Sequence, residues 1–394
     1  MRGIRAGQGI TSIAFAAVLY MCVTGAVSLH AAQDATTPPT SLANALPPGA
    51  DSEYIWKNNC ATCHAVDGTG SPQSVIGFTQ PFPNGDSLPD FTDCTTNTVE
   101  PFADWNSVIH RGGPIRGLDH HMPAFGDALT DEQIESMVHY LWTFCKDPGW
   151  PRGDLNFPRA FFTEKAFPES ESIWTTGITA KGAKAVTNAL TYEHRIQKRS
   201  QYEVTIPLNF VQMEQAGAWG KGLGDVEFAL RRTFYANLEA ASIFAAGGAV
   251  TMPTGKESLG LGEGVTVWEP FAMFDKGFGD GFIQMHGGVM YPNDRAKVER
   301  SAYFRTALGY GFAQDQGFGR AWTPMTEILW SKEKGGKSVV DIVPQMQVTL
   351  NKLQHIMLSV GVSVPATERE GRHPQFLTYF LWDWFDGGLT QYWH

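Results

Sequence analysis

The chain has 394 residues, more than one small domain needs, and this length predicts two or three folding units. Its 30 Lys and Arg against 40 Asp and Glu give a formal net charge of −10 at pH 7, with no Lys/Arg-rich block anywhere. This acidic balance argues against nucleic acid as a partner.

Residues 1–32 have the order of a secretory signal peptide. Two early arginines precede an apolar run from Ile10 to Val27, and two small alanines close the segment. We expect cleavage after them rather than a membrane anchor of borderline length. The next stretch, 33–49, is rich in Pro, Ala and Thr, which is typical of a flexible or extended spacer.

The sequence Cys60-Ala61-Thr62-Cys63-His64 has the spacing that covalent attachment of a c-type haem requires. Each thiol adds to one haem vinyl group, and the adjacent imidazole lies beneath the iron. The alternative is a thiol redox site of the CxxC kind, but the βαβ context of such sites is missing. No second CxxCH follows, so the sequence predicts one covalent haem c.

Three further features surround this motif. A short helix with early acids leads into it, a glycine-rich loop precedes Met122-Pro123-Ala124-Phe125-Gly126, and an amphipathic helix begins after Thr130. With these features, residues 50–146 resemble the class I cytochromes c. The resemblance implies an all-α domain in which His64 and the thioether of Met122 are the axial ligands of the haem iron.

Several side chains near these ligands have alternative roles. His110, His120 and His121 could replace Met122, and the resulting bis-His iron would have a lower reduction potential. A histidine near a haem is otherwise a surface group or a propionate contact. Three residues are possible contacts of the haem propionates, and the alternative is that each is a solvated loop residue. They are Arg111, Arg116 and Trp105.

Two cysteines, Cys94 and Cys145, remain once the haem motif and Cys22 of the expected signal peptide are set aside. In an oxidising compartment such a pair predicts a disulfide, here between a loop and the end of the last helix of the domain. Two reduced, buried thiols are the alternative.

Residues 147–171 have no sustained hydrophobic period and predict a linker between domains. From 172 to 394 the period is two, as in residues 202–210, where apolar side chains alternate with polar ones. We count about twelve such segments, long enough for a membrane β-barrel, with aromatic residues such as Trp382, Trp384 and Phe385 near their ends as interfacial girdles. The segments are 173–181, 188–196, 201–211, 224–235, 240–252, 264–275, 278–292, 301–314, 318–331, 338–350, 353–365 and 374–386.

The predicted fold is therefore a class I cytochrome c domain followed by an antiparallel transmembrane barrel of about twelve strands, with a soluble β-sandwich as the alternative to the barrel. This architecture resembles the fused porin–cytochromes. The resemblance implies one-electron transfer by a haem c that is held in the periplasm at the mouth of an outer-membrane barrel, and a part in electron transfer across that membrane. A body of about a hundred residues is too large for such a lumen, so we expect the cytochrome domain to dock at the mouth.

Two other functions remain open at this stage. One is an outer-membrane solute porin with a redox-sensing cytochrome, and the other is a soluble periplasmic cytochrome subunit of an oxidoreductase. An electron carrier is favoured over a catalyst, because a six-coordinate iron has no open position and no nucleotide-binding fingerprint follows a strand. The expected partners are the outer membrane and periplasmic electron donors or acceptors, and nothing in the sequence sets an oligomeric state.

Overall fold

The computed structural model describes residues 50–70, 88–182, 184–212, 218–385 and 387–393. The expected signal peptide (1–32) and spacer (33–49) lie outside the described residues. All of the described residues belong to one compact unit, Ala43–His394. Among them, no helix has the length and apolar character that a membrane crossing requires.

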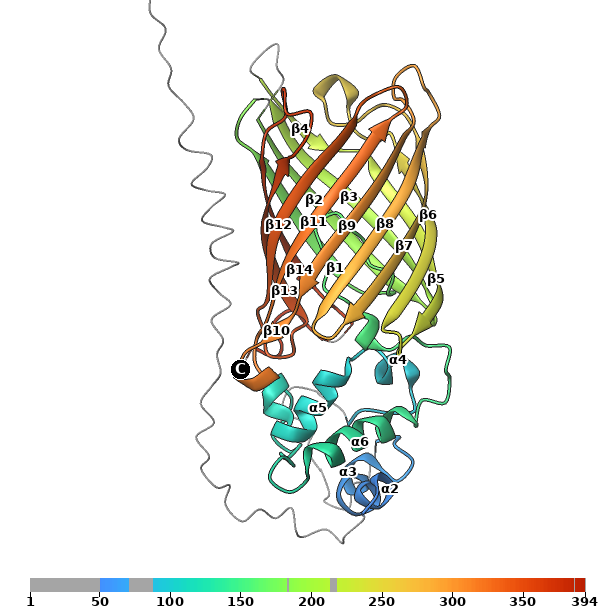
Figure 1. The fold of residues 1–394 in the computed structure, drawn as a ribbon, viewed down its shortest axis with the longest axis vertical. Coiled ribbons are helices and arrows are strands. Elements are labelled where there is room, and N and C mark those ends of the chain that lie inside the picture. The colour runs from blue at the N-terminus through green and yellow to red at the C-terminus, as the bar shows by residue number, and fades with distance from the viewer. Residues whose placement is uncertain (1–49, 71–87, 183, 213–217, 386, 394) are drawn as a thin grey trace, which may run out of the picture. The chain divides into compact units, whose positions relative to one another are not determined.

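The first part of the chain is helical, as expected for a cytochrome c domain (Figure 1). A capping box at Thr130 and Gln133 begins the last helix, as the sequence predicts, and Ile134, Met137, Val138 and Leu141 on one face of that helix are buried. They pack with Ile55 and Trp56 of the first helical segment to form the core of this part. The helices are α2 (Ser52–Ile55), η2 (Trp56–Cys60), α3 (Ala61–His64), α4 (Cys94–Asn97), α5 (Phe102–Arg111), η3 (Gly113–Arg116), α6 (Asp131–Trp142) and η4 (Gly153–Leu155).

The second part is a closed antiparallel barrel. In the described part of the chain fourteen strands form one sheet, in which β4 and β10 are short additions and the other twelve strands form the barrel wall. The strands are β1 (Ser172–Thr179), β2 (Ala185–Ile196), β3 (Ser200–Gln212), β4 (Trp219–Leu223), β5 (Val226–Asn237), β6 (Ser242–Met252), β7 (Val267–Phe278), β8 (Gly281–Pro292), β9 (Ser301–Tyr310), β10 (Phe312–Ala313), β11 (Ala321–Glu333), β12 (Ser338–Thr349), β13 (Ile356–Pro365) and β14 (Gln375–Trp382). Short 3₁₀ turns, η5 (Glu257–Leu259) and η6 (Asp315–Gly317), lie in the loops.

Pairing of β1 with β14 closes the sheet, with Ser172 opposite Trp382 and Thr179 opposite Gln375. A closed sheet leaves no unpaired edge, which is the condition for a β structure to cross lipid. The predicted barrel of about twelve strands is therefore confirmed, and the soluble β-sandwich alternative is wrong. Because the strand number is even, the chain enters and leaves the barrel at the same end.

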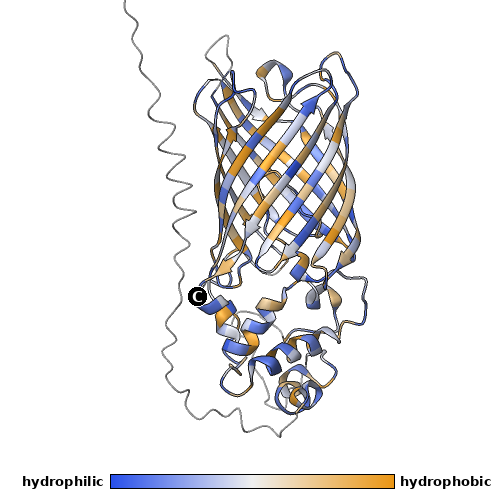
Figure 2. Ribbon diagram, in the orientation of Figure 1, coloured by the Kyte–Doolittle hydropathy of each residue, from blue (hydrophilic) through white to orange (hydrophobic). Residues whose placement is uncertain are grey.

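Side chains alternate along the strands between an apolar outer face and a more polar interior. The two kinds of residue follow one another along the ribbon (Figure 2). On β3, Ile206, Leu208 and Phe210 are exposed on the outside, whereas Gln201 is buried inside. The twelve wall strands have 8 to 13 residues, a range that includes the roughly 9–11 needed to cross hydrocarbon at a tilt. An exposed apolar belt of this kind is expected to face lipid.

The segment after the helical domain lies inside the barrel, where it contacts the inner face of the wall. Arg159 is 7% exposed, and its guanidinium donates to Glu193 of β2. The Tyr379 hydroxyl of β14 donates to the backbone carbonyl oxygen of Arg159. Ala166 N donates to the Asp275 carboxylate of β7 at 2.7 Å. Nothing in the sequence indicated this position, since we expected 147–171 only to join the two domains.

Buried charges connect this segment, which we call the plug (residues 157–171), to the wall. Arg159 contacts the carboxylates of Glu164, Glu171 and Glu193, and Arg231 of β5 contacts Glu164 and Glu193 from the other side. Two guanidinium groups therefore lie among the three carboxylates. An unpaired charge that is buried in the barrel interior would be unfavourable, because it has lost its hydration. This arrangement provides each of the five charged groups with a partner of opposite charge.

Glu327 of β11 anchors the backbone of the plug. Its carboxylate accepts from the backbone N–H groups of Phe161, Phe162 and Thr163 at 2.9, 3.0 and 2.7 Å, and from Gln345 Nε2 at 2.7 Å. The carboxylate is fully buried. The Glu327 carboxylate therefore supplies the hydrogen-bond acceptors that a neighbouring strand would provide for a regular segment.

We expect Glu327→Ala to destabilise the barrel. The substitution leaves three buried N–H groups of the plug without their acceptor, and each such loss costs about 1–3 kcal/mol, so the free energy of unfolding falls by at least about 3 kcal/mol. Urea titration of the folded, heat-modifiable form measures this change. Glu333→Ala, at an exposed position of the same strand, is the matched control and leaves the titration unchanged. Equal midpoints for the two variants would contradict this role of Glu327.

Candidate functional site

Cys60, Cys63 and His64 lie on consecutive turns at the start of the helical domain. The Asp51 side chain caps this helix by accepting from Tyr54 N at 2.8 Å, and the fully buried Trp56 donates from its indole N–H to Val66 O at 3.1 Å. The helix thus begins at a side-chain cap and is fixed by a buried indole. It ends at His64, because Ala65 has a φ of 62°.

Burial sets the protonation state of this motif. Desolvation raises the pKa of the Cys60 thiol to about 12, and it also raises the pKa of Cys63. Burial lowers the pKa of His64 to about 4, so the imidazole is neutral and can be a metal ligand. A thiol redox site needs a lowered thiol pKa, so these shifts disfavour the CxxC alternative.

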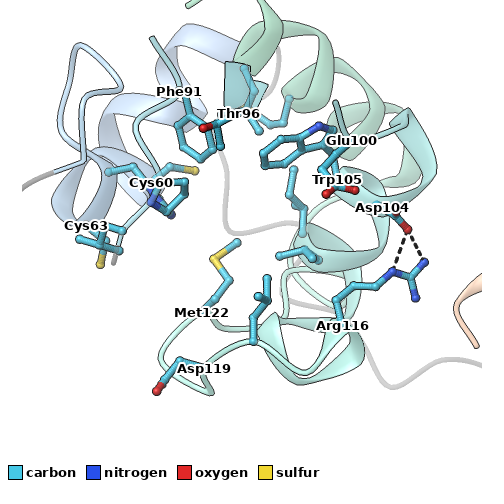
Figure 3. Close-up of a pocket in the computed structure, with 18 of the residues that line it drawn as sticks. Cys60, Cys63, Phe91, Thr96, Glu100, Asp104, Trp105, Arg116, Asp119 and Met122 are labelled. Carbon is cyan, nitrogen blue, oxygen red and sulfur yellow. Dashed lines mark hydrogen bonds and ion pairs between the residues drawn. The ribbon is translucent and has the colours of Figure 1, made fainter. Parts of the chain in front are cut away.

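The motif lines a cavity of about 950 Å³. This volume is at the upper end of the roughly 300–1,000 Å³ that cofactor sites occupy. Cys60 and Cys63 stand on one side of it, Trp105 and Arg116 on the other, and the thioether of Met122 extends between them (Figure 3). Cys60, Cys63 and Met122 therefore line the same cavity.

Two glycines position the loop that carries Met122. Gly113 N donates to Met122 O at 2.9 Å, and a Cβ on Gly112 would lie 2.9 Å from the same oxygen. Gly112 also has a φ of +82°, which glycine adopts at little cost. The close approach of α5 to this loop thus depends on residues without side chains.

The three competing histidines have different positions. His110 and His120 do not line the cavity. His110 Nε2 lies 3.4 Å from the Asp131 carboxylate, and His120 Nδ1 lies 3.2 Å from the Asp119 carboxylate. His121 does line the cavity, and its Nδ1 lies 2.5 Å from the Asp119 carboxylate. Of these three histidines, only His121 remains as an alternative to Met122 as an iron ligand.

The three possible propionate contacts also differ in whether they line the cavity. Arg116 is 2% exposed, lines the cavity, and donates from Nε to Asp104 Oδ1 at 2.8 Å. Trp105 lines the cavity too, and its buried indole N–H has no partner among the described residues. Arg111 is exposed, its guanidinium lies over the Phe318 ring, and it is not part of the cavity wall.

A disulfide joins Cys94 of α4 to Cys145, which follows α6. The side-chain amide of Asn97 supports the same connection by donating to Phe91 O and Leu141 O. Phe91 packs against both Trp56 and His64, so the bond holds a wall of the cavity to the last helix.

These residues fit a haem c. The cavity has two thiols at the required spacing, a neutral imidazole, a thioether and an otherwise mainly apolar wall. His64 Nδ1 is buried and has no hydrogen-bond partner among the described residues, and the Trp105 indole N–H also has none. Cys60, Cys63, His64 and Met122 are the residues that would hold the haem, and bound haem would supply reversible one-electron chemistry.

Sequence reasoning missed one wall of the cavity. Leu353, in the turn between β12 and β13, and Phe385 and Tyr392, which follow β14, also line it. We expected Phe385 to belong to an interfacial girdle; the structure places it after β14, 42% exposed and in the cavity lining. The sequence analysis placed Phe385 near the end of the predicted strand 374–386, whereas β14 ends at Trp382. An aromatic residue of a girdle and one of a cavity wall look alike in a sequence.

Taken together, the fold and the cavity define a cytochrome c domain that is fused to an outer-membrane type of β-barrel. Residues 47–141 match the family described as cytochrome C oxidase, cbb3-type, subunit III, which places a cytochrome c domain in this part of the chain. No curated protein matches the chain.

Several solved outer-membrane proteins are similar to this chain at low identity. The KdgM porin is 9% identical, covers 54% of this chain and 98% of its own, and has a TM-score of 0.38. An outer membrane channel from Pseudomonas putida F1 is 14% identical, covers 57% and 99%, and has a TM-score of 0.39. The NanC porin is 10% identical, covers 53% and 97%, and has a TM-score of 0.37.

We expect Met122→Ala to change the haem spectrum and to lower the reduction potential, because the thioether favours reduced iron. Visible spectroscopy and a redox titration of the purified full-length protein measure both. His121→Ala removes the neighbouring alternative ligand and leaves both properties unchanged. If His121→Ala changes them and Met122→Ala does not, the axial assignment passes to His121.

Proposed function

We propose that this protein transfers single electrons by one covalently bound c-type haem, held in the periplasm at the mouth of the outer-membrane barrel, as part of electron transfer across that membrane. The cavity lined by Cys60, Cys63, His64 and Met122 carries the proposal. The residues around it would attach the haem, ligate its iron and exclude water, and no group in the cavity needs to take part in proton chemistry.

The arrangement of the chain supports docking at the barrel mouth. Arg116 Nη1 donates to Phe318 O at 2.5 Å, in the loop between β9 and β11, and the His110 ring lies 4.9 Å from the ring of Phe318. On the other side, Arg199 in the β2–β3 turn donates to Gly149 O at 2.7 Å. These turns lie at the end where β1 begins and β14 ends, which is the periplasmic end of an even-stranded barrel.

The plug supports electron transfer over solute transport. Plug residues 161–163 are held by Glu327, and Arg305 of β9 donates to Phe162 O at 2.8 Å. The plug thus occupies part of the interior that a porin would leave to water. Electrons, unlike solutes, need no open channel.

We expect Cys60→Ser with Cys63→Ser to abolish covalent haem without loss of the barrel. The wild-type protein should give a haem-stained, heat-modifiable band in the outer-membrane fraction, whereas the double variant should give the same band without the stain. The reason is that both thioether bonds require the thiols. Wild-type protein in the soluble fraction, or a stained double variant after denaturation, would contradict the proposal.

We also expect the barrel to be closed to small solutes. Liposomes with wild-type protein should not swell in isosmotic sugar, whereas the Glu327→Ala variant should admit sugar because its plug has lost its anchor. Glu333→Ala is again the control and should remain closed. Rapid swelling with the wild-type protein would favour the porin alternative.

A further inference from the structure

The cavity assigned to the haem is not built by the cytochrome domain alone. Phe385 and Tyr392 belong to the residues after β14, which we call the post-barrel segment (residues 383–385 and 387–393). A third wall residue, Leu353, comes from the turn between β12 and β13. The barrel therefore contributes side chains from two places to a site whose other residues come from the helical domain.

The barrel holds the post-barrel segment in place. Lys352 N donates to Tyr392 O at 2.9 Å, and Asn351 Nδ2 donates to Gln391 O at 3.4 Å. The buried His355 ring meets the Tyr392 ring edge to face at 5.6 Å. Both donors, one backbone N–H and one side-chain amide, belong to the same β12–β13 turn that supplies Leu353, so the turn and the segment form one surface.

The cytochrome domain touches this surface at a residue without a side chain. Gly117 follows Arg116, and a Cβ at Gly117 would lie 2.9 Å from Tyr392 Cα and 3.0 Å from Tyr392 Cβ. Tyr392 itself has a φ of 63°, which is rare for an aromatic residue and persists only when its surroundings hold it. Contacts from both the turn and Gly117 provide that restraint.

We infer that the post-barrel segment is a wall of the haem site. Tyr392 and the partly exposed Phe385 line the edge of the cavity that faces the barrel, limit the access of water to it, and make the haem potential depend on the folded barrel. The inference rests on the proposed function in one respect, namely that the cavity holds a haem. An apolar shell favours reduced iron by keeping water and its high dielectric away, so loss of this wall lowers the potential.

The test uses full-length, haem-loaded protein in detergent with Tyr392→Ala or Phe385→Ala. Each variant should show a lower midpoint potential and several-fold faster haem reduction by excess dithionite, because water and the reductant reach the uncovered edge. The matched controls are Leu389→Ala and Trp393→Ala, whose exposed side chains belong to the same segment but do not line the cavity. They should behave as wild type. Unchanged potential and rate in both cavity variants would overturn the inference.

A second variant approaches the wall from the cytochrome side. Gly117→Ala should displace Tyr392 and reproduce the changes seen with Tyr392→Ala. Gly335→Ala is its control, since Gly335 also has a positive φ but a Cβ added there would meet nothing within 4 Å. The heat-modifiable band verifies that each barrel is folded. A Gly117→Ala protein with wild-type potential and reduction rate would contradict the role of the Gly117–Tyr392 contact in holding this wall.

Failure of this inference and failure of the proposed function give different results. If the wild-type protein carries no covalent haem, the proposed function fails before any variant is compared. If the wild-type haem is present and only the wall variants leave it unchanged, the inference alone fails.

Discussion

Closure of the sheet by β1 and β14 is the constraint on which the rest of the structure depends. A β structure in lipid must pair every strand edge, and twelve antiparallel strands meet that condition only if the first and last strands are neighbours. The same pairing brings Ser172 and Trp382 together at one end. The cytochrome domain and plug, which precede β1, and the post-barrel segment, which follows β14, therefore meet at that end although they are far apart in the sequence.

The interior of the barrel follows from the same closure. A closed lumen holds buried polar groups that need partners, and the plug supplies some of them. Arg159 and Arg231 lie among carboxylates from the plug and the wall, and Glu327 accepts from plug backbone groups. A lumen that holds such a segment differs from an open porin lumen.

The sequence predicted the parts that follow a simple period or spacing. Alternating residues such as 202–210 identified the strands, and the CxxCH motif with Met122 identified the residues that line one cavity. The plug could not be predicted, because an irregular segment has no period and its Arg159 and Glu164 look like solvated linker charges. The wall from Phe385 and Tyr392 was hidden for another reason. It depends on barrel closure, which brings the segment beside Gly117, and no local pattern reports such a contact.

The central claim is that electrons pass between the periplasmic haem and the outside of the closed barrel. The most direct measurement uses sealed vesicles that hold the protein with its cytochrome domain inside and its haem reduced, to which an oxidant that cannot cross the membrane is added outside. The account predicts that the haem is oxidised while an enclosed dye shows the vesicles to be intact. A haem that stays reduced until detergent is added would contradict it.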